Sequence, residues 1–208
     1  MSKPVIIDDI EQGTPEWLAL RLGVASTSNF DRIITPATGK KSTQAEAYRR
    51  GLIYERRTGL PASSGYQSAA MILGKEMEAE ARKEYEFISG ESVRQVGFVF
   101  LDEGRRIGAS PDGLIGEDGG LEKKCPLPHT HIGYLLSGKP EVSKYTAQIQ
   151  GSLWITGRKW WDFFCYCPGE KPILTRIYRD EGYIDRMSIY LRDFIQQMDE
   201  EIEFLKSA

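Results

Sequence analysis

Hydrophobic positions along the chain alternate between two spacings, one of three or four residues and one of two residues. The first spacing is that of an amphipathic helix, and the second is that of a strand with one buried face. Thr14 and Pro15 have the residue types that begin helices, and Gly59 and Gly157 have the type that ends them. The pattern predicts helices at 14–23, 26–34, 43–59, 66–87, 143–156 and 183–205, and strands at 92–100, 105–110, 120–125, 160–167 and 173–179.

The order of these elements predicts the fold class. Helices come first, three strands follow, and a helix, two more strands and a last helix complete the chain. Such an order is typical of a mixed α/β fold, with a central mixed β-sheet flanked by helices. A chain of 208 residues suits one compact domain. We therefore predict a single domain over 1–208, divided into a helical N-terminal part at 1–60, an α/β core at 66–180 and a C-terminal helix at 181–208.

Composition argues against disorder and against a membrane protein. The chain is 40% hydrophobic and 27% charged, which is ordinary for a folded protein. No stretch approaches the roughly 18 to 20 apolar residues that a membrane span needs. The three cysteines lack paired spacing, so we expect reduced thiols. These features predict a cytoplasmic protein with no membrane partner.

The charge distribution leaves two readings open. A net charge of −3 argues against a nucleic-acid partner, because phosphates usually bind to a basic surface. The basic residues, however, come in adjacent pairs, and the C-terminal segment is acidic. The pairs indicate either a basic cleft on an acidic body or solvated helix faces.

The segment SPDGLIGEDGGLEKKCP, from Ser110 to Pro126, combines an acidic turn with a charged strand. Glu122 and Lys124 are two residues apart and therefore share a strand face, while Lys123 lies on the other. The turn at Asp112 can bring its carboxylate beside Glu122. Two carboxylates suit Mg²⁺, which lowers the pKa of a bound water for phosphodiester hydrolysis, and Lys124 is then the candidate to orient that water. The alternative is a surface strand next to an ordinary Asp-Gly turn.

A further acidic residue lies on the apolar face of the helix before the strands. Glu78 shares that face with small and apolar residues, namely Met71, Gly74, Ala81 and Tyr85. A carboxylate that faces a core must be paired or must bind a metal. The helix thus predicts either a structural salt bridge or a third acidic group at the site of Asp112 and Glu122.

Five motifs in order carry a family resemblance. SPDGL is followed by GLEKKCP, with GKEME upstream, RLGVASTS near the start and YTAQIQ downstream. This combination resembles the phage lambda exonuclease family of viral recombination nucleases, within the restriction-endonuclease-like group with its PD-(D/E)xK core. The resemblance implies a Mg²⁺-dependent 5′→3′ exonuclease on linear double-stranded DNA, which releases 5′-mononucleotides and leaves a 3′ single-stranded overhang. It also implies a homotrimer ring around the DNA and a single-strand annealing protein as partner.

The resemblance also implies roles for residues of the charged motif. Asp112, Glu122 and the backbone carbonyl of Lys123 match the metal ligands, Lys124 matches the catalytic lysine, and Glu78 matches an acid on the helix. Two Mg²⁺ ions per site are implied, and Mn²⁺ is expected to substitute. Asp102 aligns with another acid near the site. The chain departs from the family at Lys123, where an apolar residue is usual, so its side chain must reach solvent or bind something.

A second set of residues matches the family's site for the 5′-phosphate of a DNA end. The set consists of Arg21, Ser28, Ser110 and Gln148, and a guanidinium with hydroxyl and amide donors suits phosphate oxygens. Met71 matches a position that helps to part the terminal base pair. Taken singly, each of these residues also suits an ordinary helix cap, surface or core position.

The histidines and the remaining cysteines have simpler interpretations than metal ligands. His129 and His131 lack the context of a metal site and are interpreted as surface side chains beside a loop. Cys165 and Cys167 are expected to fill a buried strand face. Two alternative functions remain to be distinguished from the exonuclease, a non-catalytic DNA-end-binding module and an endonuclease of the same fold.

Overall fold

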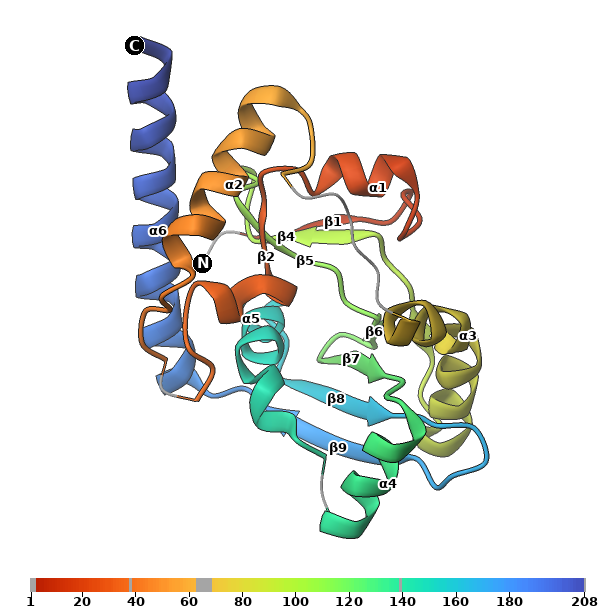
Figure 1. The fold of residues 1–208 in the computed structure, drawn as a ribbon. Helices are drawn as coiled ribbons and strands as arrows, with labels where there is room; N and C mark the ends of the chain where they lie inside the picture. The colour runs from red at the N-terminus through yellow and green to blue at the C-terminus, as the bar shows by residue number, and fades with distance from the viewer. Residues whose placement is uncertain (1–2, 38, 63–68, 139, 208) are drawn as a thin grey trace.

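A computed structural model describes residues 3–37, 39–62, 69–138 and 140–207 (Figure 1). Two mixed β-sheets form its centre, with helices around them. The first sheet has the order β1-β4-β5-β2, with β1 (Val5–Ile7), β2 (Ala25–Ser26), β4 (Phe98–Phe100) and β5 (Ile107–Ala109). In this sheet β2 pairs with β5 in parallel, and the other pairs are antiparallel.

The second sheet carries the charged motif. Its order is β3-β6-β7-β8-β9, with β3 (Val93–Arg94), β6 (Gly113–Ile115), β7 (Gly119–Lys124), β8 (Trp160–Cys165) and β9 (Ile173–Tyr178). Strand β7 pairs with β6 in antiparallel and with β8 in parallel orientation. The close contact of β7 with β8 requires Gly120, because a Cβ there would lie 2.3 Å from a ring atom of Trp161.

The helices lie on both sides of the sheets. They are α1 (Pro15–Leu20), η1 (Thr27–Arg32, a 3₁₀-helix), α2 (Ala45–Thr58), α3 (Ala69–Ser89), α4 (Pro128–Ser137), η2 (Val142–Tyr145, also 3₁₀), α5 (Thr146–Thr156) and α6 (Glu181–Ser207). Helices α3 and α6 lie on opposite sides of the molecule (Figure 1). Helix α5 contacts strands of both sheets as well as η1 and α6, which explains why it is buried on almost every face.

The helix boundaries follow the capping residues. The Thr14 hydroxyl accepts a hydrogen bond from the amide of Trp17, and Pro15 opens α1. Gly59 and Gly157 adopt the left-handed conformation after α2 and α5, with φ of 67° and 70°. This conformation strains other residue types, so these two helix ends were readable from the sequence.

The fold class prediction is confirmed, but several elements differ from the predicted pattern. The first sixty residues contain two strands, β1 and β2, which are too short to show alternation. Strand β6 lies in the segment read as a turn, and α4 lies in the segment read as a loop. Segment 26–34 forms the end of β2 and a 3₁₀-helix instead of an α-helix.

Helix α3 packs on the second sheet through a small separate core. Ala81 and Tyr85 are fully buried there against Leu121 of β7 and Phe164 of β8. The Tyr85 hydroxyl donates to the carboxylate of Asp162, which is fully buried and also accepts two hydrogen bonds from the Arg176 guanidinium, at 2.8 and 2.9 Å. The bond to Asp162 raises the pKa of Arg176, and burial followed by Asp162 raises the pKa of Tyr85.

Replacing Arg176 should strongly destabilise the fold. Arg176→Ala leaves the buried Asp162 carboxylate without its charged partner, and a buried polar group that loses a partner costs about 1 to 3 kcal/mol, or more when the group is charged. Urea unfolding would measure the loss. Arg50→Ala is the matched control, because Arg50 pairs with Glu46 on an exposed helix surface, where the expected cost is below about 1 kcal/mol. Equal losses for the two variants would contradict the assignment.

Candidate active site

The register between β6 and β7 places Asp112 at the charged part of β7. Gly113 pairs with Leu121, so Asp112 lies just before β6 at the level of Glu122. Its Oδ2 accepts a hydrogen bond from the amide of Lys123, at 2.6 Å. The last residues of β7 extend beyond the pairing with β6. There the Asp112 side chain, and not a backbone carbonyl of β6, accepts the hydrogen bond from β7. The turn and strand thus meet as the motif predicts.

Glu122 and Lys124 lie on the face of β7 that turns toward η2 and α5. The Lys124 Nζ lies 2.6 Å from Oε1 of Glu122, and Nε2 of Gln148 donates to the same oxygen at 2.8 Å. Lys124 also lies over the ring of Tyr145, 4.8 Å from its centroid. Glu122 is only 3% exposed. A buried carboxylate is therefore held between an ammonium and an amide.

The negative charges of Glu122 and Asp112 are only partly balanced by Lys124. Burial raises the pKa of Glu122, the nearby Asp112 charge raises it further, and Lys124 and Gln148 offset only part of the rise. Burial lowers the pKa of Lys124, but Glu122 and Asp112 raise it by more, so the ammonium form is stabilised. A buried carboxylate with a second carboxylate beside it is a good place for a divalent cation, because the cation supplies two positive charges.

The backbone supplies one further oxygen for such a cation. In an antiparallel pair the amide and carbonyl of one residue point to the same neighbouring strand. The Lys123 amide points to Asp112, whereas the Lys124 carbonyl accepts from Tyr166 after β8 on the other side. The Lys123 carbonyl therefore faces Asp112. Within the described residues no group of three or more His, Cys, Asp and Glu side chains could hold a metal. The oxygens that Asp112 and Glu122 offer at this point are therefore those of two side chains, beside the Lys123 carbonyl.

Lys123 and Glu78 meet on the opposite face of β7. The Lys123 Nζ donates to the backbone carbonyl of Glu78 in α3, at 3.1 Å. Both residues line a cavity of about 550 Å³ together with Asp112. The expectation that Glu78 faces the core is wrong, because its side chain is exposed. The apolar face of α3 is covered at Ala81 and Tyr85, one and two turns later, but it opens to this cavity at Glu78.

Arg21 and Ser28 are brought together, and Ser26 joins them. The Arg21 Nη2 donates to Oγ of Ser26 at 3.2 Å and to Oγ of Ser28 at 3.4 Å, and the two hydroxyls lie 2.8 Å apart. The Arg21 guanidinium also stacks over Trp17, 4.1 Å from the ring centroid, and burial lowers its pKa. Sequence reasoning missed Ser26, although it belongs to the same STS motif.

Ser110 lies at the same edge of the first sheet. Ser26 pairs with Gly108 in the parallel β2–β5 ladder, so Ser28 and Ser110 both follow the ends of their strands. The Ser110 Oγ is buried, and it has no hydrogen-bond partner among the described residues. Gln148 differs from the other three predicted phosphate ligands, because its amide is used by Glu122. The structure thus places Gln148 at the carboxylate pair.

A model of the YqaJ-like viral recombinase domain matches residues 16–159. The chain belongs to this family. The matched segment contains all the site residues described so far, from Arg21 to Gln148. A comparison with curated proteins found no match.

Solved structures resemble this chain over nearly its whole length. The crystal structure of the alkaline exonuclease LHK-Exo from Laribacter hongkongensis has a TM-score of 0.82 and 36% identity, covering 93% of this chain and 97% of that one. The same exonuclease in complex with dAMP gives the same values. A phage related exonuclease from Haemophilus somnus 129PT, with a TM-score of 0.65, 16% identity, and coverage of 88% and 96%, shares the fold. The family resemblance is confirmed, and the predicted enzyme class is confirmed as a nuclease.

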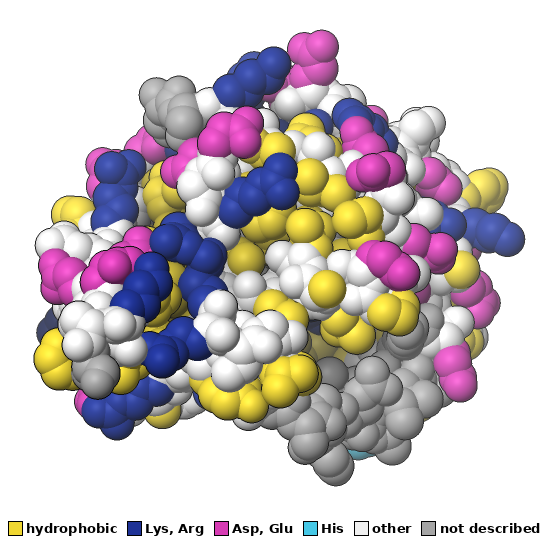
Figure 2. Space-filling view, turned by 90° about the horizontal axis from the view of Figure 1, so that it is seen from above, with side chains coloured by type: hydrophobic (Ala, Val, Ile, Leu, Met, Phe, Trp, Pro, Cys, Tyr) yellow, Lys and Arg dark blue, Asp and Glu magenta, His cyan; other side chains and the backbone are white. Residues whose placement is uncertain are grey.

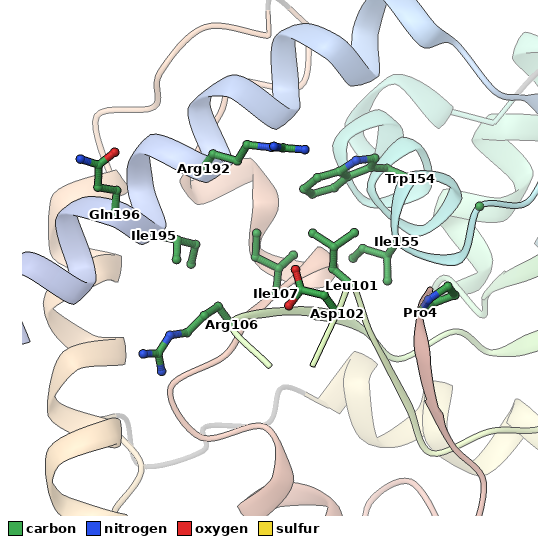
Figure 3. Close-up of a pocket in the computed structure, with 11 residues that line it drawn as sticks. Pro4, Leu101, Asp102, Arg106, Ile107, Trp154, Ile155, Arg192, Ile195 and Gln196 are labelled. Atoms are coloured by element: carbon green, nitrogen blue, oxygen red, sulfur yellow. The ribbon is translucent and has the colours of Figure 1, made fainter. Parts of the chain in front are cut away.

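One predicted residue, Asp102, lies apart from the described site. Asp102 follows β4, its Oδ1 accepts from the Gly104 amide, and it lines a different cavity beside α6 together with Trp154 and Arg106 (Figure 3). Met71 lies in the first turns of α3, and its side chain is outside the described residues. The prediction that Met71 acts as a wedge stays a prediction.

The histidine interpretation is half right. His129 is exposed, as expected, whereas His131 is fully buried in α4. A ring nitrogen of His131 lies 3.0 Å from the backbone carbonyl of Lys171, and α4 itself turns this side chain inward. Cys165 and Cys167 are both buried. No helix in the described part of the recombinase domain is long and apolar enough to cross a membrane.

The surface of the recombinase domain is not uniformly basic. The face in Figure 2 mixes acidic and basic side chains, with Lys and Arg gathered on the side of α2 and α6. A cavity there is lined by both signs of charge, with Arg56, Arg57, Arg106 and Lys206 beside Asp199 and Glu203. Four basic and two acidic side chains thus share this hollow.

Proposed function

We propose that the protein is a Mg²⁺-dependent 5′→3′ exonuclease that degrades one strand of linear double-stranded DNA. It releases 5′-mononucleotides and leaves a 3′ single-stranded overhang for recombination by strand annealing. One observation carries the proposal. A carboxylate pair with its own lysine, Asp112, Glu122 and Lys124, lies in the same family domain as an arginine that converges with two hydroxyls, in Arg21, Ser26 and Ser28.

The residues around the carboxylate pair of Asp112 and Glu122 divide the chemistry between metal binding and positioning of the water. Asp112, Glu122 and the Lys123 carbonyl are the ligands for Mg²⁺ or Mn²⁺, since these ions take oxygen ligands and keep waters for phosphate to displace. The bound ion supplies Lewis-acid stabilisation of the phosphate charge and a more acidic water. The Lys124 ammonium, 2.6 Å from Glu122, orients the attacking water, and Gln148 fixes the Glu122 carboxylate in place.

Arg21 gives the enzyme its polarity. A terminal 5′-phosphate offers oxygens to a guanidinium and to hydroxyls, and hydrogen bonds to a charged group are the strong ones. The Arg21 Nε and the Ser110 Oγ are buried and have no partner among the described residues, so both can serve an incoming phosphate. The dAMP complex of the 36% identical exonuclease supports a nucleotide site in this fold.

The proposal includes the assembly that the family resemblance implies. Three copies form a ring around the duplex, and a single-strand annealing protein receives the exposed strand in the cytoplasm of a bacterial host. A closed ring favours repeated cleavage of one DNA molecule, because the enzyme cannot leave it sideways. The molar mass of the protein in solution tests the ring.

Duplexes labelled at one terminus test the proposed polarity. With Mg²⁺, a 5′ label should be released at once as a mononucleotide, whereas a 3′ label should remain on a long single strand. Each time course is repeated with EDTA, which should stop release. Early loss of the 3′ label would reverse the polarity, nicking of closed circular DNA would indicate an endonuclease, and binding without release would indicate an end-binding module.

A further inference from the structure

Lys123 places a positive charge inside the candidate active site, on the α3 side of β7. The residue is 8% exposed, and its Nζ donates to the Glu78 carbonyl. An ammonium with so little contact with water is costly unless negative groups surround it. The relevant feature is therefore the set of acidic residues that Lys123 faces.

The cavity beside Lys123 is rich in carboxylates. It is lined by acidic residues from the segment after β1, from α3 and from the turn before β6, namely Asp8, Asp9, Glu11, Glu78 and Asp112, and its basic residues are Lys123 and Arg82. Asp112 belongs both to this cavity and to the carboxylate pair with Glu122. The Lys123 side chain lines this cavity together with Asp112 and with Glu78 of α3.

The charges of Lys123, Asp112 and Glu78 all affect the pKa of the Cys125 thiol. Burial raises the pKa of Cys125 to about 11, and among the neighbouring charges Lys123 lowers it while Asp112 and Glu78 raise it. The charges of Lys123, Asp112 and Glu78 therefore lie close enough together to affect the same thiol. Lys123 balances the two carboxylates there, as an apolar residue could not.

We propose that the Lys123 ammonium is a built-in counter-charge for Asp112 and Glu78, and that it limits each chain to one divalent ion, held by Asp112 and Glu122. The inference rests on the proposed metal-dependent function. A second divalent ion between Asp112 and α3 would lie close to a fixed positive charge and would compete with it for the same carboxylates. The two ions per site implied by the family resemblance therefore become one in this chain.

Counting bound Mn²⁺ tests the inference without an activity measurement. Calorimetric titration and the electron spin resonance signal of free Mn²⁺ give the number of ions per chain, in the presence of saturating dAMP as a source of phosphate oxygens. We expect one ion in the wild type and two in Lys123→Met. Lys83→Met is the matched control, because Lys83 is an exposed lysine of α3, and it should bind one. Glu122→Gln should lose the ion and corrects for adventitious binding.

The outcomes separate this inference from the proposed function. Two ions in the wild type, or one in Lys123→Met, would overturn the role of Lys123 and leave a metal-dependent nuclease intact. No ion in the wild type would overturn the metal-dependent function itself. Lys123→Gln, whose amide is polar but uncharged, gives the same readout if the Met variant does not fold, and thermal melting identifies that case.

Discussion

Lys124→Ala is expected to reduce the release of nucleotides from linear duplex DNA by about 10³-fold or more, while duplex binding persists. The Nζ of Lys124 is held 2.6 Å from Glu122 and over the Tyr145 ring, so it has one position from which to act on the attacking water. A positioned group that handles a proton contributes roughly 10² to 10⁴ in rate. Removing it leaves Asp112, Glu122 and the phosphate contacts in place. Acid-soluble nucleotide release and a gel-shift assay measure the two properties separately.

Glu122→Gln should give a comparable loss for a different reason. The amide keeps the shape of the side chain but cannot offer a negative charge to a cation, and it also removes the anion that stabilises the Lys124 ammonium. Lys159→Ala is the matched control for Lys124, because Lys159 forms an exposed pair with Asp118. Hydrolysis by Lys124→Ala at the rate of Lys159→Ala would remove Lys124 from the mechanism.

Arg21→Ala should abolish a preference for 5′-phosphorylated ends. The wild type is expected to degrade a 5′-phosphate duplex about 10 to 100 times faster than a 5′-hydroxyl duplex, because hydrogen bonds to a charged group contribute about 1.5 to 3 kcal/mol. Arg21 is the one cation shown to contact both Ser26 and Ser28 within the described residues. Rates of the two substrates in single-turnover conditions give the ratio directly.

A second variant at the same site and a control variant accompany Arg21→Ala. Ser26→Ala should reduce the same ratio by less, since it removes one neutral hydroxyl and keeps the charge. Arg50→Ala, on an exposed helix surface, should leave the ratio unchanged. A wild-type enzyme that degrades both ends at one rate would remove the 5′-phosphate site, and a ratio that survives Arg21→Ala would assign the site to other residues.

The sequence predicted the long elements and missed several of the short ones. Helices α2 and α6 carry a full periodic pattern, and α2 and α5 end at a glycine, so the positions of these helices follow from local chemistry. Strand β2 has two residues and β6 has three, and no alternation can be seen over such lengths. Strand β2 is positioned by its pairing with β5, which is distant in the sequence, and β6 is positioned by its pairing with β7, which follows it.

The candidate site shows the same division. Strand alternation alone places Glu122 and Lys124 on one face of β7 and Lys123 on the other, and the contacts agree with that division. Alternation cannot tell which face meets which helix. Only the packing of α3 and α5 on opposite faces of β7 gives Lys123 the Glu78 carbonyl and gives Glu122 the Gln148 amide.

The burial of two residues, Glu78 and His131, could not be predicted from the sequence. Glu78 has the spacing of a core position, but α3 reaches past the edge of the core there, so the side chain borders a cavity. His131 follows a proline in a segment without clear periodicity, yet α4 buries it completely. What the sequence by itself determined was the identity and strand face of the charged residues, because these depend on neighbours in the chain. Which of those charges share a site was decided by the tertiary structure, because burial and electrostatic pairing depend on residues that only folding brings together.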